Sequence, residues 1–255
     1  MSELEVQSTA EPVGAAGLTQ LQRITNTFTA PSKTFEDIRR GNKSWWLPLI
    51  VMALAGYLLF AAVSQKIGIQ QTVDNQVRMN ARQQEQMAQA SPEQREKANQ
   101  IALAITKGVF LGGPLIGLAA FALLSLVMLA TINFIFGGRA SYASIFAVYY
   151  YAYLPSVVKV LLGVIVIYAG ITPESFNIKN FAPTNIGAFL DPMETNKALY
   201  ALATSFDAVT IWTLVLLSIG IATVAGVKRS SGYIAVFGWW ALVVLVGAGT
   251  ALVFG

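Results

Sequence analysis

The sequence contains no cysteine and no histidine among its 255 residues. Without cysteine there are no disulfides and no thiolate chemistry, so the sequence carries no information about the redox compartment. Without histidine the chain lacks the most common metal ligand and the most common general base at neutral pH. HExxH zinc proteases and serine–histidine hydrolases are therefore excluded. We expect no enzymatic activity, no metal and no cofactor.

Charge is also scarce. Asp, Glu, Lys and Arg make up 12% of the chain, about half of their usual share in a soluble domain, whereas apolar residues make up 55%. The charges concentrate in a few segments and leave five apolar runs. Each run is close in length to the roughly 20 helical residues that cross a bilayer. The sequence therefore predicts an all-α membrane protein, a bundle of five transmembrane helices in lipid. The net charge of +4 fits cytosolic anchoring residues rather than nucleic-acid binding.

The five expected spans lie within a transmembrane domain that occupies residues 45–255. The first span is followed by a polar, Gln-rich loop at 64–106. Ser91 in this loop is expected to cap a helix, with Pro92 at the first helical position and Gln94 completing a capping box. The individual spans are expected at 45–63, 109–136, 143–168, 207–226 and 233–254.

The N-terminal region divides into two parts. Residues 1–17 are polar, acidic and rich in small side chains, which predicts a disordered tail. Residues 18–44 are predicted to form an amphipathic cytosolic juxtamembrane segment that lies on the membrane surface. Its apolar residues begin at helical spacing: Leu18, Leu21, Ile24 and Phe28.

A second short helix is expected within this segment, after a break at Pro31. Ser32 is a suitable residue to cap its N-terminus. Phe35 and Ile38 would then form the side that faces the membrane. The sequence thus predicts two surface helices that precede the first span.

Basic residues near the span ends predict the orientation. Placing the N-terminus in the cytosol puts a cluster before the first span and two short basic turns on the inner side. Trp45 and Trp46, directly after the cluster, are expected in the interfacial aromatic belt. An odd number of spans then puts the C-terminus outside, and we expect the cytoplasmic (inner) membrane of the cell. The inner residues would be Arg39, Arg40, Lys43, Arg139, Lys228 and Arg229.

Four glycines form two pairs at four-residue spacing around the start of the second span: Gly108 with Gly112, and Gly113 with Gly117. Such pairs present a flat strip that lets another helix approach closely. Packing inside the chain is the favoured interpretation. A homo-oligomer contact remains the alternative, because the motif itself fits both.

Lys159 is the one ionisable residue deep within a predicted span, and Asp207 opens the next span from the same side of the membrane. A direct pair would satisfy both charges, so we predict an ion pair between the third and fourth spans. The alternative is that the Lys159 stem extends to the interface. With Asn133 and Tyr153, the pair forms a candidate intramembrane polar site whose role, structural or ligand-binding, stays open.

Several short motifs resemble the YIP family, the Ypt/Rab-interacting membrane proteins, in its bacterial branch. The clearest is the stretch from Pro31 to Ile38 followed by that from Trp45 to Ile50. The remaining motifs are Tyr153-Leu154-Pro155, Phe206-Asp207, Ile211-Trp212 and Ile219-Gly220.

The resemblance implies an integral membrane protein with a cytosolic N-terminus and no known catalytic activity. Eukaryotic relatives act in membrane trafficking and bind prenylated small GTPases, but the bacterial character of the N-terminal motif leads us not to expect a GTPase partner. We expect a non-enzymatic scaffold or adaptor that organises other membrane proteins or the bilayer. The alternative is a small transporter or channel component that uses the polar site near Lys159.

Overall fold

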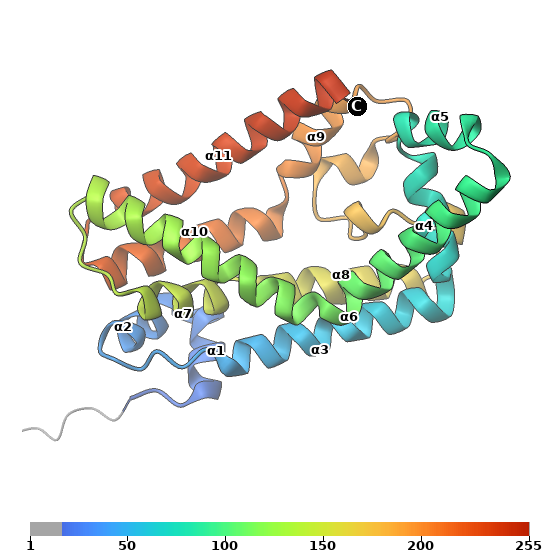
Figure 1. Cartoon of the computed structure of the whole chain (residues 1–255). Helices are drawn as coiled ribbons and strands as arrows, with labels where there is room; N and C mark the ends of the chain where they lie inside the picture. Colours follow the sequence, from blue (N-terminus) through green and yellow to red (C-terminus); the bar gives the residue numbers. More distant parts are fainter. Residues whose placement is uncertain (1–16, 255) are drawn as a thin grey trace, which may run out of the picture.

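The computed structural model describes residues 17–254, so the predicted tail of residues 1–17 lies outside the described residues except for its last position. Within these residues, five helices are long and apolar enough to cross a membrane, which confirms the all-α membrane fold. They run up and down between two ends of an elongated bundle (Figure 1). The helices of the five spans are α3 (Trp46–Ala62), α6 (Pro92–Ala130), α7 (Tyr142–Ala152) with α8 (Pro155–Tyr168), α10 (Ala208–Ala225) and α11 (Arg229–Phe254).

The third span consists of two helices rather than one. α7 ends at Ala152, and α8 begins at Pro155 after a turn at Tyr153 and Leu154. Proline has no N–H to continue the ladder of α7, but it fits the first position of a new helix. By contrast, Pro114 lies inside α6 without ending it, and π-helical turns at Val63–Ile67 and Thr131–Ile135 extend α3 and α6.

The expected polar loop at 64–106 is largely helical. It contains α4 (Ile69–Arg78), α5 (Ala81–Gln89) and the first turns of α6. The helix that begins after Ser91 was expected, whereas α4 and α5 were not. Polarity does not oppose helix formation, because Gln, Ala, Arg and Glu are all good helix formers. The predicted capping box is confirmed, since Ser91 Oγ accepts the N–H of Gln94 at 3.3 Å and Gln94 Oε1 accepts the N–H of Ser91 at 2.9 Å.

The segment between the third and fourth spans folds into short elements at the same end of the bundle as α4 and α5 (Figure 1). Three 3₁₀ turns precede α9. The bounds are Pro173–Ser175, Ile178–Asn180 and Ile186–Phe189 for the turns, and Lys197–Ser205 for α9.

The two N-terminal helices are α1 (Gln20–Thr29) and α2 (Pro31–Arg39). Both exist as expected, but α2 does not turn Phe35 and Ile38 to the membrane: both side chains are 0% exposed and belong to the main core cluster. Nor does Ser32 cap α2, because Ala30 holds that position and Pro31 is the first helical residue. The juxtamembrane segment is therefore part of the bundle.

A missing side chain on α10 explains how α2 enters the core. A Cβ built on Gly220 would lie 3.0 Å from two ring carbons of Phe35 and 2.5 Å from Cγ1 of Val148. Glycine at this position leaves the space that the Phe35 ring fills. The contact joins residues about 185 positions apart in the chain and holds α2 against α7 and α10.

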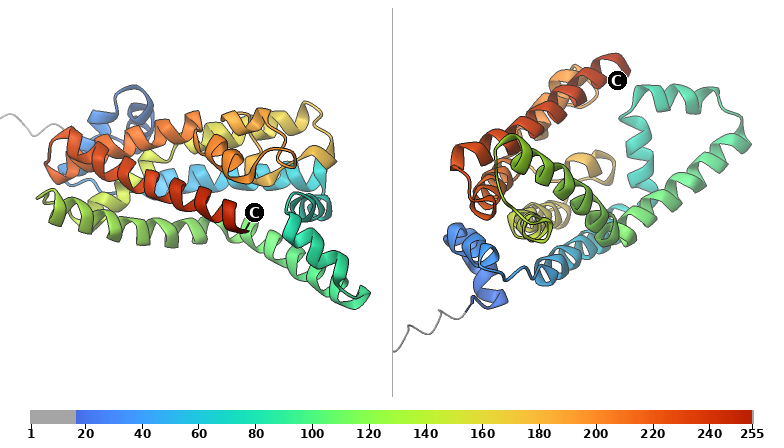
Figure 2. Two further views of the ribbon diagram at one scale, coloured as in Figure 1. Left: turned by 90° about the horizontal axis from the view of Figure 1, so that it is seen from above. Right: turned by 60° about the vertical axis from the view of Figure 1, so that its left-hand side comes forward.

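α10 is the central helix of the bundle, with 61% of its most apolar stretch buried. The corresponding values are 22% for α6 and 17% for α11. Figure 2 shows α11 along the outside of the bundle and α4, α5 and the start of α6 as a three-sided frame that projects from one end. Most of the surface of α6 and α11 is therefore available to lipid or to other proteins.

We expect Gly232→Ala to destabilise the contact between α10 and α11. A Cβ at Gly232 would meet the backbone oxygen of Ser218 and lie 2.9 Å from Cβ of Ala222, so the helices must separate. Such overpacking costs about 1–3 kcal/mol. Gly238→Ala on the same helix is the matched control, because nothing lies within 4 Å of its Cβ position and alanine favours helix. Thermal unfolding in detergent measures both; equal stability of the two variants would contradict this packing.

Candidate functional site

The ion pair predicted between the third and fourth spans is present. Lys159 Nζ, on α8, lies 3.0 Å from Oδ2 of Asp207, the residue that precedes α10. The Asp207 side chain is 2% exposed and that of Lys159 is 24% exposed. The lysine head therefore reaches the edge of the bundle while its partner is enclosed.

Asp207 also connects three other groups. Its Oδ1 accepts the N–H of Thr210 at 2.8 Å and so caps α10. Its Oδ2 accepts hydrogen bonds from the Thr184 hydroxyl and from Nδ2 of Asn185 at 3.4 Å. The N–H of Ala208 in turn donates to the carbonyl of Thr184 at 2.9 Å. One carboxylate thus ties α8, the start of α10 and the preceding loop together.

The hydrogen bonds to Asp207 set its protonation. Burial alone raises the pKa of this carboxyl, but hydrogen bonds from Thr184, Thr210 N–H and Lys159 outweigh burial and hold the pKa below its ordinary value of 3.8. A folded-state pKa below the unfolded value means that the carboxylate stabilises the fold at neutral pH. This contribution is lost as the pH falls through the folded-state pKa.

Asn133 and Tyr153 do not join the ion pair. Asn133 closes the turn between α6 and α7, where its Nδ2 donates to the carbonyl of Ala140 and its Oδ1 accepts the Ala140 N–H, both at 3.0 Å. This turn lies at the end of the bundle near α1 and α2, whereas the loop bound by Asp207 lies at the other (Figure 1). Tyr153 packs on Phe121 at 4.7 Å between ring centroids. The four predicted residues therefore occupy three separate places.

Aromatic rings fill the space between the second and third spans. Phe121 on α6 contacts Tyr149 and Tyr150 as well as Tyr153. Trp45 stacks on Tyr150 at 5.1 Å and so belongs to this cluster, whereas its neighbour Trp46 is 51% exposed. The tyrosines pack with other rings, so they act as core residues.

A second buried charge, which the sequence did not reveal as such, lies in the N-terminal helices. Arg23 on α1 is 0% exposed, and its Nε lies 3.3 Å from Oδ2 of Asp37 on α2. Its Nη1 donates to Asn42 Oδ1 at 3.1 Å and to the carbonyl of Ser44 at 3.0 Å, and Nη2 donates to the Asn42 carbonyl at 2.7 Å. Arg23 therefore joins both helices to the chain that leads into α3.

The same arginine fixes the helix pair to the bundle. Its guanidinium lies 4.3 Å from the ring centroid of Tyr151 on α7, whose hydroxyl donates to Oε1 of Gln20 at 2.7 Å. The polar positions Gln20, Arg23 and Thr27 share one face of α1, and this spacing is the signal in the sequence that could have indicated the contact. The apolar stripe of α1 predicted contact with the membrane surface. The face of α1 that is buried in the protein is instead the polar one.

The glycine strip of α6 does not pack inside the chain, which corrects the favoured interpretation. Built Cβ atoms at Gly108, Gly113 and Gly117 have nothing within 4 Å, and that at Gly112 meets only Ile116 of the same helix. The helices that contact α6 are α3, α4 and α7. The strip is therefore an outward surface of the second span.

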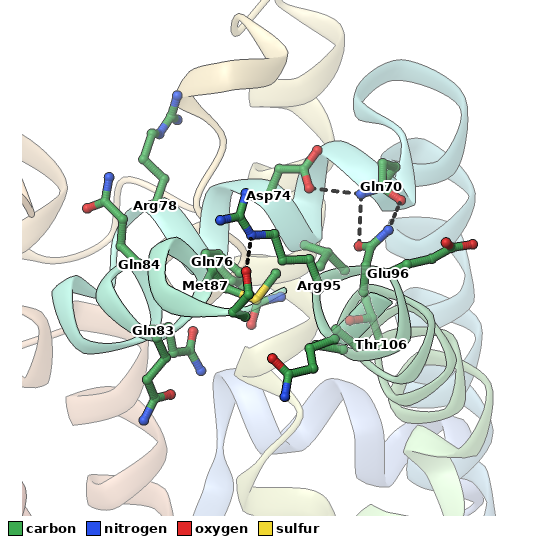
Figure 3. Close-up of a pocket in the computed structure, with 18 of the residues that line it drawn as sticks. Gln70, Asp74, Gln76, Arg78, Gln83, Gln84, Met87, Arg95, Glu96 and Thr106 are labelled. Atoms are coloured by element: carbon green, nitrogen blue, oxygen red, sulfur yellow. Dashed lines mark hydrogen bonds between the residues drawn. The ribbon is translucent and has the colours of Figure 1, made fainter. Parts of the chain in front are cut away.

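A hollow of about 1040 Å³ lies between α4, α5 and the start of α6 (Figure 3). Most of the side chains that line it are polar. Nε2 of Gln70 donates to Oδ1 of Asp74 on α4 at 2.8 Å and to Oδ1 of Asn99 on α6 at 3.0 Å. Arg95 donates to the carbonyls of Ala88 and Ala90 and so holds α5 in place. The hydrogen bonds among its lining residues hold the three-sided frame together.

Five apolar spans, internally paired charges and an aromatic centre define a polytopic α-helical membrane protein. The family model for the Yip1 domain matches residues 25–250, which is most of the chain. The chain belongs to this family, as the sequence motifs had indicated. The matched residues include the whole of α2. No curated protein and no solved structure matched.

Proposed function

We propose that the protein is a non-enzymatic membrane scaffold or adaptor that presents the outer faces of α6 and α11 to other membrane proteins. The observation that carries the proposal is that Lys159, Asn133 and Arg23 are all engaged in contacts that hold the fold together. The groups that a transport pathway would use thus have structural partners. What remains outward is apolar surface and the glycine strip, which is suited to close contact with another helix.

The alternative, a small transporter or channel component, would use a polar path near mid-membrane. The tyrosine cluster that could have lined such a path is packed ring against ring around Phe121. Asn133 is engaged with Ala140, away from Lys159. These contacts favour the scaffold over the transporter.

Photo-crosslinking tests the scaffold proposal. A photoreactive amino acid at Leu115, which is 74% exposed beside the glycine strip, should capture a discrete protein in native membranes. Leu54 on α3, 64% exposed and outside both proposed surfaces, is the matched position for comparison and should give lipid adducts. Repeating the crosslinking with purified protein in liposomes shows whether the captured partner is a second copy of the chain. Lipid adducts alone at Leu115, together with solute flux in these liposomes, would favour the transporter.

We further propose that the protein lies in the inner membrane of the cell, as expected for the bacterial branch. In the proposed orientation, the N-terminus is in the cytosol. The α4–α5 frame and the C-terminus then lie outside. Because the chain has no native cysteine, Ser91→Cys introduces a single thiol. A membrane-impermeant maleimide added to whole cells should label it fully. Protection in cells, with labelling only after the cytosolic side is opened, would reverse the orientation.

A further inference from the structure

A cavity of about 720 Å³ lies where α2 meets the turn between α10 and α11, at the end of the bundle opposite the α4–α5 frame. Its size is within the roughly 300–1000 Å³ of small-ligand sites. Three basic side chains from elements far apart in the sequence line it. These are Lys33 and Arg40 from the α2 region and Arg229 at the start of α11.

The two carboxylates that line the cavity are already paired. Asp37 faces the buried Arg23 at 3.3 Å, and Glu36 lies 3.4 Å from both Arg39 and Arg40. Among the described residues, neither Lys33 nor Arg229 forms a salt bridge. Within residues 17–254, the cavity therefore carries positive charge that no carboxylate pairs with.

A neutral hydroxyl lies beside this charge. Arg229 Nη2 donates to Ser32 Oγ at 3.2 Å, which brings the guanidinium to the first turn of α2. A guanidinium, an ammonium and a hydroxyl together match the oxygens of a phosphate, with arginine able to donate two parallel hydrogen bonds.

The position of the cavity along the bundle indicates which kind of molecule would supply that phosphate. Thr223, which also lines it, belongs to the α10 span, and Arg229 opens the α11 span. The cavity thus lies where two membrane helices end, at the depth of lipid headgroups. Its positive charge would repel the choline cation of a zwitterionic lipid. We propose that this cavity binds the headgroup of an anionic phospholipid from the surrounding leaflet.

Native mass spectrometry of the detergent-solubilised full chain tests the site, with phosphatidylglycerol and phosphatidylcholine as probes. Phosphatidylglycerol should be retained in preference to phosphatidylcholine. Lys33→Gln and Arg229→Gln should each weaken its binding about fivefold, the usual effect of one basic residue at an anionic surface. Both side chains are exposed, so both variants should fold, and circular dichroism confirms this.

Lys43→Gln is the matched control, since it removes one exposed charge near the same end of the bundle without lining the cavity. It should leave phosphatidylglycerol binding unchanged. Equal weakening by Lys43→Gln would show general surface attraction and overturn the site. Equal retention of the two lipids would also overturn it. Full displacement of phosphatidylglycerol by inorganic phosphate would overturn the lipid assignment and leave a soluble phosphate site.

Discussion

Arg23→Met should lower the free energy of unfolding by about 3–5 kcal/mol, the usual cost of removing one partner of a buried ion pair. The guanidinium is fully buried, and its loss leaves the carbonyls of Asn42 and Ser44 without their donor. Asp37 loses its cationic partner and keeps only the neutral donors Leu18 N–H and Asn42 Nδ2. The α1–α2 pair should then detach from α7, because the contact with Tyr151 disappears as well. Unfolding in detergent gives the stability, and hydrogen exchange of α1 and α2 reports the detachment.

A second substitution separates the charge effect from the loss of packing. Arg23→Met with Asp37→Leu should be more stable than Arg23→Met alone, since no unpaired carboxylate then remains in the core. Arg39→Met is the control: its side chain is 54% exposed, and its pair with Glu36 is a surface pair worth at most about 1 kcal/mol. A loss for Arg23→Met no larger than that for Arg39→Met would show that the N-terminal helices are not held by this arginine.

Lys159 and Asp207 should behave as a coupled pair. Lys159→Met and Asp207→Asn should each cost about 2–3 kcal/mol, below the usual range for buried pairs because Lys159 is partly exposed. The double variant should cost much less than the sum, because no charge is then left without its partner. The measurement is a double-mutant cycle on unfolding in detergent.

Lys179→Met, which removes an exposed lysine from the same loop, controls for the general loss of positive charge and should change stability by less than about 0.5 kcal/mol. Simple addition of the two single effects would mean that Lys159 and Asp207 act independently. Lys159 would then be free to serve a polar path, and the transporter alternative would gain support.

The sequence predicted those features that depend on length, composition and neighbouring charge. Five apolar runs gave five spans, and the position of Lys159 and Asp207 on one side of the membrane gave their ion pair. The grouping of Asn133 with this pair was wrong, because Asn133 binds Ala140 in the turn between α6 and α7. Polarity alone was insufficient for the 64–106 region, where helix-forming residues build α4 and α5.

The features that sequence reasoning missed depend on long-range shape. Phe35 has the pattern of a lipid-facing residue, and only the space at Gly220 on a distant helix makes it a core residue. Arg23 likewise reads as a surface charge until Asp37, Asn42 and Tyr151 surround it. The open glycine strip shows the converse case, since a motif for helix contact has no partner within the chain.

Water access to the third span tests most directly whether the bundle centre is a packed structural core. Ala147 and Ala152 on α7 are 0% exposed, and Ala→Cys substitutions change their volume little in this cysteine-free chain. A small hydrophilic methanethiosulfonate should label neither position from either side of proteoliposomes, while Ser91→Cys reacts readily. Labelling at Ala152→Cys in the folded protein would reveal a water-filled path through the bundle and contradict the scaffold account.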